Sequence, residues 1–172
     1  MTLELRPATA TDADAVADVY LRSRKELVDC APLVHSDESV RDWVGRHLIP
    51  RGSTTVAVVA GQVVGLMAVS TAADCGWIDQ LYLHPAWIRR AIGTRLLELA
   101  RRKLPPPIRL YSFQCNTDAR SFYEQHGFTA IAFGDGSGDE EKCPDILYEW
   151  RPEQSGPPAS LARGERRACR QT

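Results

Sequence analysis

The sequence WIDQLYLHPAWIRRAIGTRLL, residues 77–97, decides the fold that we expect for this chain. Its first part alternates with a period of two, which is typical of a strand, and its two faces carry Trp77, Asp79, Leu81 and Leu83 against Ile78, Gln80 and Tyr82. Pro85 ends this strand. Apolar residues then recur at helical spacing, at Ile92, Leu96, Leu99 and Ala100. The stretch therefore predicts a strand, a short turn and a helix.

The turn between that strand and that helix contains Arg89, Arg90 and Gly93. A strand-to-helix turn directs free backbone N–H groups and the positive end of a helix dipole to one point, and this combination binds phosphate. On this stretch alone, the alternative is a surface turn with solvated arginines, because one glycine and two arginines are a weaker signal than a full glycine-rich motif.

Further strands are expected on both sides of this unit. Residues 54–60 and 63–71 are rich in β-branched residues, and Gly61-Gln62 between them predicts a tight hairpin. The helix is expected to run to about Leu104, where three consecutive prolines end it, and residues 108–113 form the next strand. A strand–helix–strand unit of this length predicts a right-handed parallel crossover.

The sequence NTDARSFYEQHGF, residues 116–128, predicts a second short helix on this side of the chain. Thr117 is the expected N-cap, Gly127 fits the position after the helix, and one face carries Ala119, Phe122, Tyr123 and His126. Residues 128–133 and 146–150 are expected to be strands, joined by a polar loop with five acidic residues.

The N-terminal part is expected to contain one edge strand and two helices. Leu3 and Leu5 alternate with polar residues before Pro7, which indicates the strand. Thr11 is the expected cap of a helix that runs to about Asp29, and Ser36 caps a second helix that ends before Pro50.

Length and composition favour a single globular domain. The chain has 172 residues, 44% hydrophobic and 25% charged, and we place the domain at residues 1–151. Residues 152–172 have no periodicity and an excess of arginine, so we interpret them as a basic, disordered tail. A formal net charge of −1 gives no reason to expect nucleic-acid binding, and no apolar segment is long enough to span a membrane.

The N-terminus lacks the basic and apolar regions of a signal peptide. The five cysteines are scattered, without a CxxC pair or a histidine at metal-ligand spacing. We therefore expect a cytoplasmic protein with reduced thiols and no metal site. A homodimer is compatible with the sequence, which does not determine the oligomeric state.

With both motifs identified, the chain from about Leu3 to Trp150 resembles the GNAT superfamily of N-acetyltransferases. The order of the expected elements matches that fold; LYLHPAWIRRAIGTRLL resembles the family's acyl-CoA pyrophosphate loop, and NTDARSFYEQHGF resembles its second cofactor motif. The resemblance implies an α/β fold in which helices flank a mixed, mostly antiparallel sheet. This sheet is expected to be splayed where the strands 77–83 and 108–113 run parallel.

The resemblance also implies that acetyl-CoA is the acyl donor and that particular residues bind it. The backbone of Leu81 to Leu83 is expected to pair with the pantetheine arm and to present an N–H to the developing oxyanion. The full set of expected cofactor-binding residues is Leu81, Tyr82, Leu83, Ile88, Arg89, Arg90, Ala91, Ile92, Gly93, Thr94, Asn116, Ala119 and Phe122.

Two positions of the loop depart from the family's usual pattern. Ile88 stands where the family has glutamine or arginine, and Ala91 stands at its first glycine. The Cβ of Ala91 limits how closely the backbone approaches a pyrophosphate, so we expect these departures to lower the affinity for the cofactor without changing its identity.

The implied reaction is direct attack of an amine on the thioester in a ternary complex. Tyr123 matches the family's general acid, because a phenol with a pKa of about 10 keeps its proton at neutral pH. We expect Asp79 to be the general base, since strand interiors disfavour aspartate, with His35 and Glu141 as second choices. From the residues alone, the alternatives are a Tyr123 packed in the core and an Asp79 hydrogen-bonded to a neighbouring loop.

The expected acceptor is a primary amine of a small molecule or a peptide. His35, Glu140 and Glu141 are expected beside it, and the acidic loop suggests a cationic amine unless that loop is simply solvated. One alternative for the whole protein is an acyl-CoA-binding sensor or interaction module of the same fold that does not catalyse transfer. Another is an unrelated α/β protein that binds a nucleotide phosphate.

Overall fold

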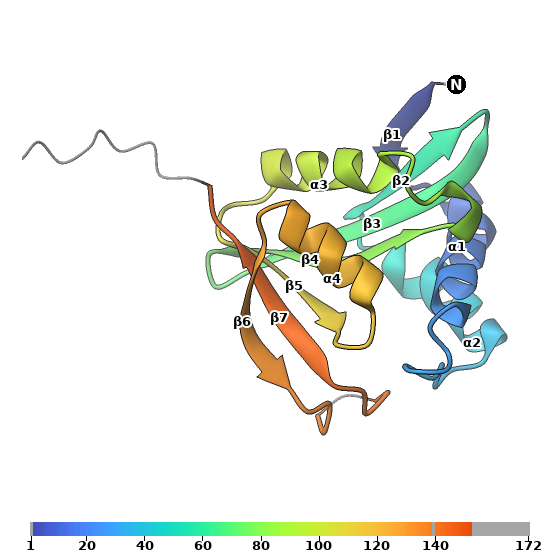
Figure 1. Ribbon diagram of the computed structural model, residues 1–172. Helices are drawn as coiled ribbons and strands as arrows, with labels where there is room; N and C mark the ends of the chain where they lie inside the picture. Colours follow the sequence, from blue (N-terminus) through green and yellow to red (C-terminus); the bar gives the residue numbers. More distant parts are fainter. Residues whose placement is uncertain (1, 139, 153–172) are drawn as a thin grey trace, which may run out of the picture.

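A seven-stranded mixed sheet forms the centre of the molecule (Figure 1). The computed structural model describes residues 2–138 and 140–152, so nearly all of the predicted basic tail lies outside the described residues. The strands are β1 (Leu3–Pro7), β2 (Thr54–Val59), β3 (Gln62–Ala72), β4 (Cys75–Leu83), β5 (Ile108–Phe113), β6 (Thr129–Gly134) and β7 (Asp145–Trp150). Their order is β1-β2-β3-β4-β5-β7-β6, and only β4 and β5 are parallel neighbours. The predicted mixed, mostly antiparallel sheet is therefore confirmed.

Helices cover both faces of the sheet. One face carries α1 (Ala13–Lys25) and α2 (Asp37–Trp43), and the other carries α3 (Ile92–Lys103) and α4 (Thr117–Gln125), as Figure 1 shows. The short elements are η1 (Ala10–Asp12), η2 (Val44–Leu48), which continues α2 as a π-helical turn, and η3 (Pro85–Trp87). Each pair of helices buries its own hydrophobic cluster against the sheet.

Strand β2 contributes side chains to both hydrophobic clusters. All six of its residues are buried. Val56 and Val58 belong to the cluster under α1 and α2, whereas Ala57 and Val59 belong to the cluster under α3 and α4. Because successive side chains of a strand point to opposite faces, a continuous apolar run is what a strand covered on both faces requires.

The start of the first helix differs from the prediction. Thr9, not Thr11, precedes the helical turns, and Asp12 Oδ2 accepts hydrogen bonds from the Thr9 backbone N–H at 2.7 Å and from Thr9 Oγ1 at 2.9 Å. The guanidinium of Arg6 holds both oxygens of the same carboxylate at 2.8 and 2.9 Å, and it holds the pKa of Asp12 well below its usual range. This fork ties the end of β1 to the entry of α1.

Three other predicted boundaries are shifted. Helix α1 ends at Lys25 rather than near Asp29 and passes into tight turns, with the Leu27 N–H bonded to Arg24 O and the Cys30 N–H to Leu27 O. The hairpin turn between β2 and β3 is Ala60-Gly61, whose φ angles of 50° and 79° are both positive, as a two-residue hairpin of this kind needs. The cap of α4 is Asn116, whose side chain accepts from the Ala119 N–H, rather than Thr117.

The parallel strands β4 and β5 are paired at only two positions. Only Gly76 with Ile108 and Trp77 with Arg109 are paired. A Cβ atom on Gly76 would lie 2.6 Å from Leu104 Cβ and 2.8 Å from Pro105 O, so only glycine permits this close approach of the chain that follows α3. Beyond Trp77 the two strands separate.

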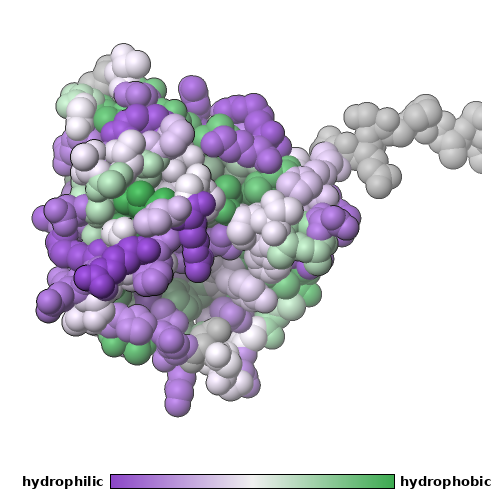
Figure 2. Space-filling model, turned by 180° about the vertical axis from the view of Figure 1, so that it is seen from behind, coloured by the Kyte–Doolittle hydropathy of each residue, from purple (hydrophilic) through white to green (hydrophobic). Residues whose placement is uncertain are grey.

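The surface carries mixed charge. In Figure 2, hydrophilic side chains cover much of the face turned away in Figure 1, and hydrophobic ones form small patches between them. Within residues 2–138 and 140–152, no helix is long and apolar enough to cross a membrane. The same described residues contain no cluster of three or more His, Cys, Asp or Glu side chains that could hold a metal ion.

Candidate active site

The separation of β4 from β5 opens a cavity of about 1180 Å³. The backbone of β4 beyond Trp77 has no partner on the β5 side, and residues 78–83 line the cavity. The other walls come from β5, from the start of α3, from α4 along its length, from the end of α1, and from β6, β7 and the loop between them. Residues far apart in the sequence therefore meet where two neighbouring strands inside the sheet stop pairing.

The loop between β4 and α3 forms one end of the cavity. Arg89 and Ala91 have φ angles of 58° and 59°, in the left-handed region that glycine adopts more easily. The N-terminus of α3 has no side-chain cap and no acidic residue in its first turn. Its first N–H groups have no partner within the helix, and they direct the positive end of the helix dipole to the cavity.

Most of the predicted cofactor-binding residues line the cavity, and two do not. Those that line the cavity are Leu81, Tyr82, Leu83, Ile88, Arg89, Ala91, Gly93, Thr94, Asn116, Ala119 and Phe122. The remaining two are Ile92, which is buried in the core, and Arg90, whose guanidinium lies 4.8 Å from the centre of the Trp87 ring.

Helices α3 and α4 are in close contact beside the loop. A Cβ on Gly93 would lie 3.0 Å from the Phe122 ring, so this glycine allows the contact between the helices. Phe122 O lies 2.7 Å from His126 Nδ1, and His126 Nε2 lies 3.0 Å from Thr94 Oγ1. When His126 is neutral, Nδ1 must therefore carry the proton, and Nε2 accepts from the Thr94 hydroxyl.

Tyr123 reaches the middle of the cavity from α4. Its side chain is 7% exposed and belongs to the core under α3 and α4, yet it also lines the cavity. Burial raises the pKa of this phenol above its usual value, so the phenol is fully protonated at neutral pH. Tyr123 is therefore a core residue that also faces the cavity, and its role as general acid stays a prediction.

Asp79 also faces the cavity, but the predicted regular alternation of β4 is wrong at this point. Ala68 pairs with Gln80 and Val69 with Ile78, so Asp79 has no opposite residue and forms a bulge. Its carboxylate is exposed and accepts a hydrogen bond from Ser70 Oγ at 3.0 Å. Desolvation by the surrounding protein raises the pKa of Asp79, and the Ser70 hydroxyl opposes this effect.

The opposite end of the cavity is lined by α1 and by the loop before β7. Ser23 and Arg24 line it from α1, Leu27 lines it from the turn after α1, and Phe113 lines it from β5. Arg24 Nη2 lies 3.4 Å from Glu141 Oε1. This arginine was not identified as a site residue from the sequence. The exposed His35 and Glu140, which were predicted to lie beside the acceptor, contact one another at 2.7 Å.

Residues 21–128, more than half of the chain, match the sequence model of the acetyltransferase (GNAT) family. The chain belongs to the GNAT acetyltransferase family.

Solved GNAT structures share this fold. PaiA N-acetyltransferase from Thermoplasma acidophilum, solved in complex with coenzyme A, is 21% identical, with a TM-score of 0.68 over 88% of this chain and 100% of that chain. The apo form of YjaB from Escherichia coli is 20% identical, with a TM-score of 0.70 over 87% of this chain and 98% of that chain. The ribosomal-protein-S18-alanine N-acetyltransferase from Escherichia coli is 14% identical, with a TM-score of 0.65 over 87% and 93% of the two chains. No curated protein sequence matches significantly.

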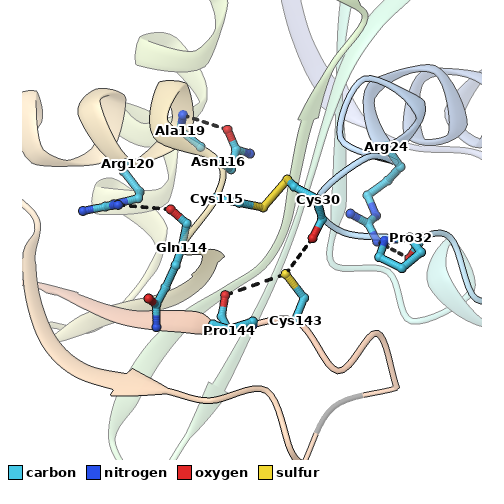
Figure 3. Close-up of a disulfide and its surroundings, with 10 residues drawn as sticks. All are labelled: Arg24, Cys30, Pro32, Gln114, Cys115, Asn116, Ala119, Arg120, Cys143 and Pro144. Carbon is cyan, nitrogen blue, oxygen red and sulfur yellow. Dashed lines mark hydrogen bonds between the residues drawn. A yellow bond between two sulfur atoms is a disulfide. The ribbon is translucent and has the colours of Figure 1, made fainter.

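One feature of this GNAT domain contradicts the sequence prediction. Cys30 and Cys115, 85 residues apart, form a disulfide (Figure 3), so the expectation that all thiols are reduced is wrong for this pair. Cys75 and Cys143 are free and buried, and the Cys143 thiol donates to Cys30 O at 3.1 Å. The disulfide ties the segment after α1 to the turn before α4, directly beside Asn116. Disulfides are uncommon in a reducing cytoplasm, so the cysteines no longer support the predicted location.

The left-handed conformation of Ala91 leads to a stability prediction. Ala91→Gly should raise the free energy of unfolding by about 1 kcal/mol, because glycine adopts this conformation without the Cβ clash. Ala73→Gly is a matched control, since Ala73 has a φ of 49° in the exposed turn between β3 and β4 and does not line the cavity. Chemical denaturation should give a similar gain for both variants. A loss of stability in Ala91→Gly alone would contradict the loop conformation.

Proposed function

We propose that this GNAT domain is an N-acetyltransferase that moves the acetyl group of acetyl-CoA to a primary amine of a small molecule or a peptide. The observation that carries the proposal is one continuous cavity. It joins an uncapped helix N-terminus, an unpaired strand edge and a buried protonated tyrosine. The likeness to PaiA, which was solved with coenzyme A, supports the choice of acyl donor.

The residues at the α3 end fit the donor. The free N–H groups of the loop and helix start, with Arg89 beside them, suit a pyrophosphate, which is anionic and accepts hydrogen bonds. The unpaired edge of β4 at Leu81–Leu83 suits the amide-containing pantetheine arm, since an open strand edge pairs with another extended amide chain. Asn116 uses its carbonyl oxygen to cap α4, which leaves its NH₂ group as the donor toward the cavity.

Tyr123 is proposed as the general acid. Bound acetyl-CoA supplies an activated acyl group, and the neutral amine attacks the thioester carbonyl carbon as the C–S bond breaks. Tyr123 then donates its phenolic proton to the departing sulfur, and the proton that the acylated nitrogen loses returns to the phenolate. Burial of the phenol keeps this proton in place until the thiolate forms, because a thiolate in a poorly solvated site is a strong base.

Asp79 is proposed as the general base that takes the proton of the incoming ammonium group. The bulge turns its carboxylate out of the regular alternation, and its raised pKa makes it a better base than an ordinary aspartate. The amine is proposed to arrive from the α1 end, past His35, Glu140 and Glu141, because the opposite end is assigned to the donor. In this arrangement the donor and the acceptor meet between β4 and Tyr123.

Turnover tests the proposal directly. Thiol release from acetyl-CoA should require an added primary amine and give the acetylated amine, identified by mass spectrometry. Tyr123→Phe should lower kcat by about 100-fold or more, as loss of a general acid does, while the Kd for acetyl-CoA changes little. Tyr148→Phe is the control, because Tyr148 is buried in the same core but its hydroxyl binds Glu124 at 2.7 Å, outside the cavity lining. Binding of acetyl-CoA without transfer to any amine would instead support a non-catalytic acyl-CoA-binding module.

The role of Asp79 predicts a pH dependence. A base is active when it is deprotonated, so kcat/KM should rise with pH through the raised pKa of Asp79. Asp79→Asn should remove this acidic limb, and Ser70→Ala should move it to higher pH, because the Ser70 hydrogen bond lowers that pKa. Steady-state rates between pH 4.5 and 8 test both variants. An unchanged profile in Asp79→Asn would exclude Asp79 as the base.

A further inference from the structure

Arg24 is a buried cation whose hydrogen-bonding capacity is only partly used at the α1 end of the cavity. Its side chain is 1% exposed, and Nη1 has no hydrogen-bond partner. The other terminal nitrogen makes two long contacts, to Pro32 O at 3.5 Å and to Glu141 Oε1 at 3.4 Å. Figure 3 shows the Arg24 side chain extending from α1 toward Pro32. The guanidinium lies 4.8 Å from the centre of the Phe113 ring, and both residues line the cavity.

This arrangement is unfavourable without a ligand. A buried guanidinium stays charged, and a buried donor without a partner destabilises the folded protein. Glu141 compensates only in part, since it is 28% exposed and contacts a single nitrogen at a long distance. Arginine presents its N–H groups as a planar fork, and the group that satisfies such a fork best is a carboxylate.

We propose that the amine acceptor carries a carboxylate and that Arg24 binds it, so that the substrate class is an amino acid rather than a polyamine. This inference rests on the proposed N-acetyltransferase activity and specifies its acceptor. The acceptor's carboxylate takes the free Nη1 and a second N–H of the fork, and its amine extends toward the centre of the cavity.

The charges around the α1 end agree with a zwitterionic acceptor. Of the acids in the loop before β7, Glu140 is paired with His35, and the Asp135 carboxylate accepts from the Ser137 N–H of its own loop. Glu141 faces Arg24. Asp135 and Asp145 also line the cavity, so carboxylates and one buried guanidinium are present together, and an acceptor with both an ammonium and a carboxylate group suits this mixture of charges.

The position of Arg24 is compatible with transfer at Tyr123. Arg24, Tyr82 and Tyr123 line the same cavity. Leu27 and Phe113 line the same end of the cavity and supply apolar surface for the part of an acceptor that joins its carboxylate to its amine. The comparison of α-, β- and γ-amino acids below measures which separation between the carboxylate and the amine of the acceptor is best.

The test compares amino acids with their carboxamides as acceptors for the full chain. Matched pairs of α-, β- and γ-amino acids are assayed by thiol release from acetyl-CoA. In the wild type, at least one acid should have a kcat/KM about 10- to 100-fold higher than that of its amide, the range of a hydrogen-bonded charge. The amine of the amide is less basic, so more of it is neutral and able to attack at a given pH. This difference favours the amide, and a preference for the acid is therefore stronger evidence for a carboxylate site.

Variants then assign the preference to Arg24. Arg24→Gln should reduce the ratio of acid to amide to about 1, and Arg24→Lys should give an intermediate ratio, because lysine keeps the charge without the fork. Arg22→Gln is the matched control, since Arg22 lies on the same helix, is 57% exposed and pairs with Asp18. It should leave the ratio unchanged.

The possible failures are distinguishable. Amides that are acetylated as well as or better than their acids in every wild-type pair would overturn the carboxylate inference and leave the acetyltransferase standing. A preference for the acid that survives in folded Arg24→Gln would overturn the assignment to Arg24. If no amine, acid or amide, releases thiol, the proposed function itself fails. The wild-type comparison decides the outcome even if the Arg24 variants do not fold.

Discussion

The structure depends on the point where β4 and β5 stop pairing. Two pairs of residues join the strands, and Gly76 allows the chain after α3 to approach closely enough to make this junction. Beyond it the rings of Trp77 and Tyr111 stack at 5.8 Å between centroids, and the strands diverge. The sheet thereby loses hydrogen bonds along one strand edge and gains a cavity inside the domain. An open strand edge is stable only when another extended group or solvent satisfies its amides.

The two ends of the cavity differ in how they present positive charge. At the α3 end, the charge is partial and distributed over backbone N–H groups, and left-handed Arg89 and Ala91 shape the loop around them. At the α1 end, the charge is a single buried guanidinium. A cavity with two anion-attracting ends and a protonated tyrosine in its lining suits an anionic acyl donor at one end and an acceptor with a carboxylate at the other.

The sequence predicted the elements well because their signals are local. The β-branched residues in 54–60 and the helical spacing after Ile92 require no knowledge of the rest of the chain. The bulge at Asp79 depends on how β3 pairs with β4, and the Cys30–Cys115 disulfide joins residues 85 apart. Neither has a local signal. Arg24 could have been recognised, since it lies four residues after Tyr20 and three before Leu27, on the face of α1 that carries apolar residues.

Hydrogen exchange of the β4 amides, with and without acetyl-CoA, tests the central claim most directly. The claim is that the open edge of β4 and the start of α3 bind the acyl donor. Acetyl-CoA should slow exchange within residues 78–83 and 89–94 and leave the paired strands β6 and β7 unchanged, while adenosine alone should have no effect on β4. Binding that protects other segments but not β4, or no binding at millimolar acetyl-CoA, would contradict this account.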